Sequence, residues 1–156
     1  MTVRVIALDL EGTLVSSAVS QFPRPGLFEL LEFCFKVAER VALFTSVREE
    51  KAREVVARLV ADGLAPAIAA TDLEYIDWPC RGLKDLAFVT GASLDEVVLI
   101  DDQESCIVPE QREQWIPVAE FDPQFAEPPY TDPPDRELDR VRAVLASYPF
   151  TGETPF

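Results

Sequence analysis

Five short apolar runs, separated by longer amphipathic segments, constrain the fold of this chain more than any other feature. The first run, VRVIALDL, is rich in β-branched residues and is followed by the turn-forming sequence Glu11-Gly12-Thr13. A run of this kind is typical of a central strand that is buried on both faces. The same interpretation predicts strands at Val3–Leu10, Arg40–Thr45, Ala65–Ala70, Val97–Ile100 and Ile116–Val118.

Helical spacing of apolar residues fills most of the intervals between these runs. The predicted helices lie at Leu27–Glu39, Arg48–Asp62, Leu83–Val89 and Asp135–Tyr148. Ser46 is placed to cap the second of them, and an irregular loop is expected at Thr71–Gly82. Strands that alternate with helices are joined by right-handed crossovers, so the sequence predicts an α/β fold with an open parallel sheet and helices on both faces.

The length of 156 residues fits one domain spanning 1–156, in which 122–134 is a proline-rich extended segment before the C-terminal helix. No apolar run approaches the roughly 20 residues that cross a bilayer, and the apolar N-terminal stretch lacks a small-residue cleavage site. We therefore expect a cytoplasmic protein without a membrane partner. Three cysteines without a CxxC pair indicate neither a disulfide framework nor a thiolate metal site.

The charge and the absence of histidine exclude several function classes. A formal net charge of −14 disfavours nonspecific binding to nucleic acid or anionic lipid. The chain has no histidine, which excludes the Ser-His-Asp triad, the Cys-His pair and His-ligated metal sites. Any catalysis must therefore use carboxylates, hydroxyls, lysine or a thiol.

Polar side chains follow the predicted strands at the point where each strand ends. They are Asp9, Glu11, Thr45, Asp101 and Asp102, together with Lys84 at the start of the helix before the fourth strand. Because parallel strands end at one edge of a sheet, we expect these groups to converge there. Clustered carboxylates raise one another's pKa unless a cation intervenes, and hard oxygen ligands suit Mg²⁺. The hydroxyl and the ammonium group would supply the donors that phosphate oxygens need.

Four segments in this order resemble the motifs of the haloacid dehalogenase superfamily: Asp9-Leu10-Glu11-Gly12-Thr13, Leu43-Phe44-Thr45-Ser46, Lys84 and Asp101-Asp102. Within that superfamily the chain is most similar to the capless phosphatases of the C-terminal-domain type, also called the NLI-interacting-factor family. The likeness spans most of the chain, because RPG at Arg24–Gly26, LKDL around Lys84, LIDDQ at the fourth strand, WIPVAEF at Trp115–Phe121 and DREL at Asp135–Leu138 all look like that family's segments.

This resemblance implies a Rossmann-like fold and a magnesium-dependent phosphomonoester hydrolase that works in two steps. Asp9 is the expected nucleophile and becomes a phosphoaspartate. Glu11 is the expected general acid toward the leaving oxygen and the general base toward water.

The resemblance also implies roles for the other motif residues. Thr45 and Lys84 are expected to bind the phosphate. The expected Mg²⁺ ligands are the Asp9 carboxylate, the Glu11 backbone carbonyl and a side chain of the fourth motif. Asp102 is the more direct candidate there, with Asp101 as a further ligand or an orienting partner.

Capped members of the superfamily insert a lid after the first motif or between the second and third. Here Leu14–Phe44 holds one loop, one helix and one strand, and Ser46–Leu83 holds two crossover elements and a loop, so no cap domain is expected. An open site admits a phosphorylated protein or peptide, and small phosphoesters as well. Tyr75, Trp78 and Arg81 are candidates for one wall of that site.

Two other kinds of protein use similar residues or the same fold. A response-regulator receiver uses similar groups, but it places the acidic pair after its first strand, whereas here Asp101-Asp102 comes last. A non-catalytic binding module is the stronger alternative, because mitochondrial translocase receptors resemble this phosphatase type and Glu11 stands where the family usually has aspartate. Enolase-phosphatases carry glutamate at that position, and the retention of Asp9, Thr45 and Lys84 favours an enzyme.

Overall fold

The computed structural model describes residues 1–152, and its centre is a five-stranded sheet in the order β3-β2-β1-β4-β5. The strands are β1 (Val5–Leu8), β2 (Arg40–Leu43), β3 (Glu74–Tyr75), β4 (Val97–Asp101) and β5 (Trp115–Pro117). Every neighbouring pair is parallel, so all strands end at the same edge. The predicted open parallel sheet is confirmed.

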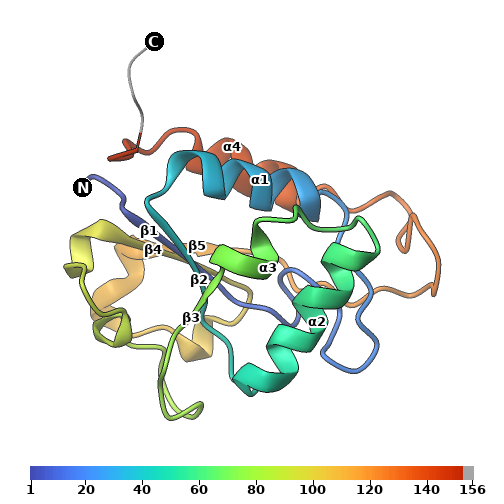
Figure 1. The fold of residues 1–156 in the computed structure, drawn as a ribbon, viewed down its shortest axis with the longest axis horizontal. Coiled ribbons are helices and arrows are strands. Elements are labelled where there is room, and N and C mark those ends of the chain that lie inside the picture. The colour runs from blue at the N-terminus through green and yellow to red at the C-terminus, as the bar shows by residue number, and fades with distance from the viewer. Residues whose placement is uncertain (153–156) are drawn as a thin grey trace.

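The α-helices gather over one face of this sheet (Figure 1). They are α1 (Leu27–Val37), α2 (Glu49–Ala61), α3 (Ala69–Asp72) and α4 (Glu137–Leu145). Helices α1 and α4 lie side by side, and the larger hydrophobic cluster joins their apolar faces to Ile6 and Leu8 of β1. Period-two alternation sends Val5 and Ala7 to the opposite face.

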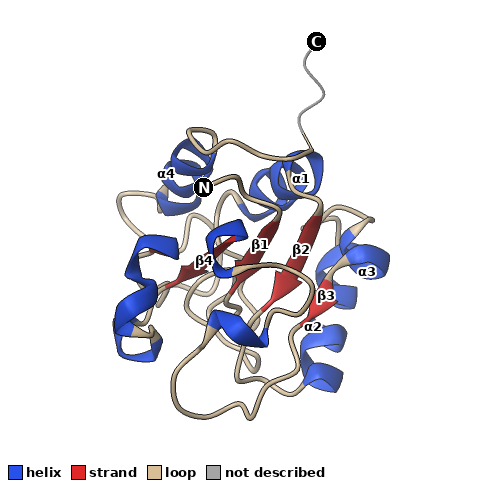
Figure 2. Ribbon diagram, turned by 90° about the vertical axis from the view of Figure 1, so that its left-hand side faces the viewer, coloured by secondary structure: helices blue, strands red, loops and turns tan. Residues whose placement is uncertain are grey.

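Short 3₁₀ helices and loops cover that opposite face, as Figure 2 shows to the left of and below the strands. These helices are η1 (Leu86–Phe88), η2 (Leu94–Glu96), η3 (Glu104–Cys106) and η4 (Pro109–Gln114). They enclose a smaller cluster that includes Phe44, Trp78 and Leu99. Both faces of the sheet are therefore covered, one by α-helices and the other by 3₁₀ helices and loops.

Three local predictions were wrong. The segment Ala65–Ala70 is not a strand, because it leads into α3 through bonds such as Ala69 N–H to the Pro66 carbonyl (2.9 Å). Alanine is a poor strand former, and the true third strand, β3, is too short to give a periodic signal. Ser46 is exposed and does not cap α2, whose N-cap position is Arg48.

The segment Leu83–Val89 also contains no α-helix. Asp85 accepts a hydrogen bond from the Ala87 N–H (2.9 Å) and starts only the 3₁₀ turn η1. Lys84 therefore precedes the turn in extended backbone, where its N–H bonds to the Cys106 carbonyl (2.7 Å).

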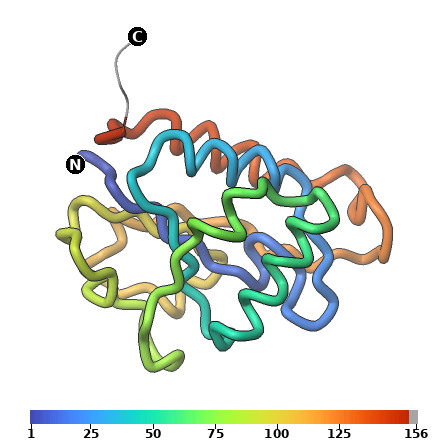
Figure 3. Tube along the Cα trace, viewed as in Figure 1, coloured from blue at the N-terminus to red at the C-terminus, as the bar shows by residue number. Residues whose placement is uncertain are grey.

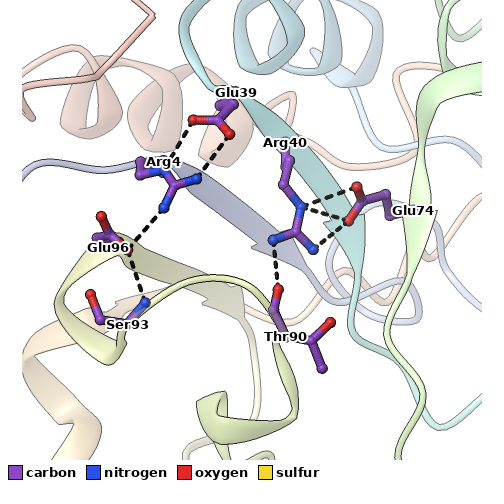
Figure 4. Close-up of polar contacts among 7 residues, drawn as sticks. All are labelled: Arg4, Glu39, Arg40, Glu74, Thr90, Ser93 and Glu96. Atoms are coloured by element: carbon purple, nitrogen blue, oxygen red, sulfur yellow. Dashed lines mark hydrogen bonds and ion pairs between the residues drawn. The ribbon is translucent and has the colours of Figure 1, made fainter.

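Ion pairs join the strands at the amino edge of the sheet (Figure 4). Arg4, just before β1, bonds to Glu39 (2.9 Å) and to Glu96 (3.2 Å), which precede β2 and β4. Arg40 of β2 bonds to Glu74 of β3 (2.8 Å). Both signs of charge thus meet at this edge, and each of these three glutamates has an arginine partner.

The two ends of the described chain lie close together, since Val3 forms a bridge with Phe150 (Figure 3). The proline-rich segment 122–134 contains no helix or strand and loops away from the sheet before α4. Between β1 and β2 the chain holds one loop and α1, so no cap domain is inserted there. Within residues 1–152, no helix has the length and apolar character needed to cross a membrane.

Candidate active site

The carboxyl edge of the sheet brings together most of the polar residues that the sequence singled out. Asp9 directly follows β1, and its N–H continues the ladder to the Ile100 carbonyl of β4 (2.9 Å). Asp101 ends β4, and Thr45 follows β2 by two residues. All three side chains are at least nine-tenths buried, and with Glu11 and Lys84 they line one cavity of about 230 Å³.

Lys84 joins the carboxylates of two adjacent strands. Its ammonium group donates to Asp9 Oδ1 at 2.9 Å and also to Asp101 Oδ2. Only 5% of the lysine side chain is exposed, so this pair of contacts is shielded from water. Lys84 reaches this position from the 3₁₀ layer, because its backbone is bridged to Ile107.

Burial controls the ionisation of these three groups. It raises the pKa of Asp9 to about 8, because desolvation outweighs the attraction of Lys84 and the charge of Asp101 adds to the rise. Burial also raises the pKa of Asp101 above its ordinary value. For Lys84, burial alone would lower the pKa, but the two carboxylates together raise it, so the lysine remains an ammonium ion.

A group of three carboxylates fits a hard divalent cation. Oxygen atoms of Asp9, Asp101 and Asp102 lie within 4.8 Å of one another. One ammonium group faces these three acids, which leaves two negative charges when all are ionised. A bound cation would offset this excess and lower the raised pKa values, and carboxylate oxygens are the donors that Mg²⁺ prefers.

The oxygen atoms that are free to bind a cation differ between Asp101, which ends β4, and Asp102, which follows it. Both oxygens of Asp101 have protein partners, since Oδ2 accepts from Lys84 and Oδ1 accepts from the Gln103 N–H (2.8 Å). Asp102 is half-buried and accepts a hydrogen bond at Oδ1 from the Thr13 hydroxyl (3.1 Å). Its Oδ2 has no protein donor among residues 1–152, which leaves that atom available to a cation.

Gly12 and Thr13 hold Asp102 against the first motif. The Thr13 hydroxyl lies 3.3 Å from Asp9 Oδ2 as well as 3.1 Å from Asp102, so it stands between two carboxylates of the cluster. Gly12 has a φ of +74°, and a Cβ atom there would lie 2.6 Å from Asp102 Oδ2. Only glycine fits this close approach.

Glu11 lines the same cavity, but its carboxylate is not part of the acidic cluster. Its Oε2 accepts a hydrogen bond from the Ala18 N–H (2.7 Å) in the loop that follows the first motif. This bond fixes one carboxylate oxygen. The metal-binding role of the Glu11 backbone carbonyl stays a prediction.

The three residues predicted to form one wall of the site, Tyr75, Trp78 and Arg81, line two neighbouring cavities, and Trp78 lines both. Trp78 and Arg81 line the cavity of Asp9, and Trp78 donates its indole N–H to the Thr45 carbonyl (2.9 Å). Tyr75 instead faces a neighbouring cavity of about 540 Å³ and stacks with Arg53. Trp78 thus supports the chain at Thr45, just after β2, and nothing in the irregular loop around Trp78 could have indicated this contact.

Sequence reasoning missed two residues behind the cluster. Thr13 was recognised as part of a motif, but its contact with Asp102 depends on a pairing of residues 89 positions apart. Arg24 is 1% exposed and donates to the carbonyls of Gly12 and Thr13 (3.3 Å each). The sequence resemblance included Arg24 in the segment Arg24-Pro25-Gly26, but only the structure shows which groups Arg24 contacts.

Comparison with known proteins places this arrangement among phosphatases. Residues 4–151 match the sequence profile of the NLI interacting factor-like phosphatases. No curated protein sequence matches the chain. Two solved structures of the RNA polymerase II CTD phosphatase Fcp1 have a similar fold. One is a fission yeast variant bound to beryllium fluoride (TM-score 0.55), and the other is described as an essential CTD phosphatase (TM-score 0.54).

The likeness to Fcp1 concerns the fold. Sequence identity is 15% in both cases, and the superposition covers 94% of this chain. The same superposition covers 50% of each Fcp1 chain, so this chain spans about half the length of those structures.

Replacement of Lys84 tests the electrostatics of the site. We predict that Lys84→Met lowers the free energy of unfolding by about 3–5 kcal/mol at pH 7 in EDTA, because buried carboxylates lose their counter-charge. Without Lys84, Asp9 and Asp101 keep folded-state pKa values above their ordinary value of 3.8, so the folded variant holds protons that the unfolded chain releases. The wild type holds the same protons below the folded-state pKa values of its own carboxyl groups, about 8 for Asp9, so the deficit should grow as the pH rises through those values.

Urea unfolding from pH 4 to pH 9 measures this deficit on both sides of the wild-type pKa of Asp9. Lys51→Met is the matched control, since Lys51 is 46% exposed and its ion pair with Glu54 is 3.4 Å long. A Lys84→Met deficit that is as small as the control's at pH 7, or that grows toward pH 4, would contradict the electrostatic account.

Proposed function

Because the chain belongs to the NLI interacting factor-like phosphatase family, we propose that it hydrolyses phosphomonoesters by attack of the Asp9 carboxylate on phosphorus. The chemistry is that of the haloacid dehalogenase superfamily. One observation supports the proposal most strongly: Asp9, Thr45 and Lys84 line one cavity at the carboxyl edge of a parallel sheet. Ligands of open α/β sheets bind at this edge.

In the first step, an oxygen of Asp9 forms a bond to phosphorus while the bond between phosphorus and the ester oxygen breaks. Glu11 donates a proton to the departing oxygen, which leaves as an alcohol. The product on the enzyme is a phosphoaspartate. The Thr45 hydroxyl and the Lys84 ammonium group donate hydrogen bonds to the phosphoryl oxygens and stabilise their charge.

In the second step, Glu11 accepts a proton from water, and the water oxygen attacks phosphorus. The bond between phosphorus and the Asp9 oxygen breaks, which releases orthophosphate and restores the carboxylate. The hydrogen bond from Ala18 holds one oxygen of Glu11 and leaves the other for both proton transfers. This anchor orients the glutamate, whose side chain is one methylene longer than the aspartate usual in the family.

We assign a Mg²⁺ site to the acidic cluster. Asp9 and Asp102 would supply carboxylate oxygens, with the Glu11 backbone carbonyl as a third protein ligand. Asp101 would act as an orienting partner, because both of its oxygens already accept hydrogen bonds from the protein. When bound, Mg²⁺ would offset the negative charge of the cluster and of the phosphoryl group.

The substrate we favour is a phosphorylated protein or peptide. The cavity is not covered by a second domain in the described chain, so a phosphate that protrudes from a large molecule can enter. A neighbouring cavity of about 540 Å³ shares Thr45 and Trp78 with it and offers room for the groups beside the phosphate. The two solved neighbours are named as phosphatases of a polymerase domain, which agrees with a protein substrate.

Turnover should require both Asp9 and a divalent cation. We predict that Asp9→Asn folds but shows no measurable hydrolysis of p-nitrophenyl phosphate or of phosphoserine peptides, because the nucleophile and one metal ligand are lost together. In the wild type, exhaustive chelation with EDTA should abolish turnover, and added Mg²⁺ should restore it. A phosphate-release assay with circular dichroism as a folding check measures both effects.

The matched control is Asp62→Asn, which makes the same chemical change at an exposed position near the end of α2. It should hydrolyse substrate at the wild-type rate. Equal rates for Asp9→Asn and Asp62→Asn, or full activity after chelation, would contradict the mechanism. Absence of turnover from the wild type with every phosphoester would favour the non-catalytic binding module.

Replacement of Glu11 should separate the two chemical steps. An aryl phosphate has a good leaving group, so Glu11→Gln should still form phosphoaspartate, whereas hydrolysis loses its general base and slows by about 10²–10⁴-fold. The variant should therefore accumulate the intermediate. Intact-protein mass spectrometry after rapid acid quench should show an added phosphoryl mass on Glu11→Gln and little on the wild type.

Two results would remove Glu11 from the mechanism. One is turnover of Glu11→Gln at the wild-type rate. The other is a Glu11→Gln variant in which both chemical steps slow to the same extent and no phosphoaspartate accumulates. That result would indicate a damaged site rather than a lost general base. Glu29→Gln, an exposed change in α1, serves as the control for unrelated loss of charge.

A further inference from the structure

Arg24 is a fully buried cation at the back of the first motif. Its side chain is 0% exposed, and its Nη1 donates to the carbonyl oxygens of Gly12 and Thr13, each at 3.3 Å. The guanidinium carbon also lies 5.3 Å from the centre of the Phe121 ring. None of the roles proposed above for the motif residues accounts for a buried charge at this place.

The charge of Arg24 is balanced by a residue 111 positions away. Asp135 accepts from Nε at Oδ1 and from Nη2 at Oδ2, both at 3.1 Å, in a two-pronged contact. Asp135 Oδ1 also accepts the Glu137 N–H (3.1 Å), which ties it to the start of α4. A buried guanidinium needs such a partner and fully used donors to offset the cost of desolvation.

The same contacts lead to the acidic cluster in two steps. Arg24 donates to the carbonyl oxygens of two successive peptide groups, Gly12–Thr13 and Thr13–Leu14. The Thr13 hydroxyl is within hydrogen-bond distance of the carboxylates of Asp9 and Asp102. Gly12 packs so close to Asp102 that a Cβ atom on it would lie 2.6 Å from Asp102 Oδ2. The Gly12 carbonyl accepts a further bond from the Phe121 N–H (2.7 Å), so this turn is held from both sides.

We infer that the Arg24–Asp135 pair is a positioning unit, which holds the Gly12–Thr13 turn and thereby Asp9 and Asp102 in the arrangement that binds the metal ion. The pair makes the start of α4 part of the support of the active site. This inference rests on the proposed function for its metal, but its structural half concerns the turn alone. Hydrogen-bond partners of metal ligands commonly change metal affinity or activity by about 10–100-fold when they are removed.

A purely structural role would have a different signature. The pair would then only dock α4 on α1 and the loop before it, and its loss would lower the melting temperature without changing the metal affinity of the folded protein. Metal affinity measured well below the melting temperature therefore separates the two roles.

The test compares wild type, Asp135→Asn and Asp139→Asn. The first variant removes the charge and one acceptor oxygen from Arg24. The second makes the same change within α4, at a residue that pairs with Arg136 and Arg142 and forms no hydrogen bond or ion pair with Arg24. Mn²⁺ binding is titrated by electron paramagnetic resonance, and amide hydrogen exchange is followed over residues 10–15 and, as an internal reference, over α2.

For Asp135→Asn we expect the Mn²⁺ dissociation constant to rise by about 10–100-fold and exchange to accelerate in residues 10–15 but not in α2. Asp139→Asn should match the wild type in both measurements. If Asp135→Asn does not fold, Asp135→Glu replaces it, because that change keeps the charge and displaces the carboxylate by about 1.5 Å. It should weaken Mn²⁺ binding in the same direction.

Two failures are distinguishable. Unchanged Mn²⁺ affinity and unchanged exchange in a folded Asp135 variant, with a lower melting temperature, would overturn the positioning role and leave the proposed function intact. A wild type that neither binds Mn²⁺ nor hydrolyses p-nitrophenyl phosphate would overturn the proposed function and the metal-binding part of the inference with it.

Discussion

The contact of Lys84 with Asp9 and Asp101 is the interaction on which the carboxyl edge of the sheet depends. Parallel pairing of β1 with β4 brings two buried carboxylates together, and their burial raises both pKa values. The ammonium group of Lys84, which comes from the layer of 3₁₀ helices and loops, partly neutralises the two carboxylates and so stabilises them in the folded chain. It does not complete the neutralisation, because Asp102 adds a third carboxylate to the cluster.

The two edges of the sheet differ in their charge balance. At the amino edge, Arg4 and Arg40 meet acidic partners from the neighbouring strands, and the pairs lie partly in solvent (Figure 4). At the carboxyl edge, acids outnumber bases and are mostly buried. The remaining negative charge at the carboxyl edge is the physical basis for proposing a cation there.

Much of this arrangement follows from the sequence, because the carboxyl end of each of these strands is marked by a sharp change from apolar to polar residues. Asp9, Thr45 and Asp101 were placed correctly from that signal. The third strand was not, since β3 has two residues and no periodic pattern, and apolar alanines before it resembled a strand. The burial of Arg24 could not be predicted, because the sequence alone does not distinguish a buried arginine from one on the surface. Its partner Asp135 lies 111 positions away along the chain.

Asp9 is the residue that we propose to be phosphorylated during turnover. Borohydride reduces an acyl phosphate to an alcohol, so treatment of the wild type during hydrolysis of p-nitrophenyl phosphate should convert the phosphorylated aspartate to homoserine. Peptide mass spectrometry then identifies the position. The account predicts homoserine at position 9 alone, and only when both substrate and Mg²⁺ are present. Conversion at 101 or 102, or active turnover without any conversion, would contradict it.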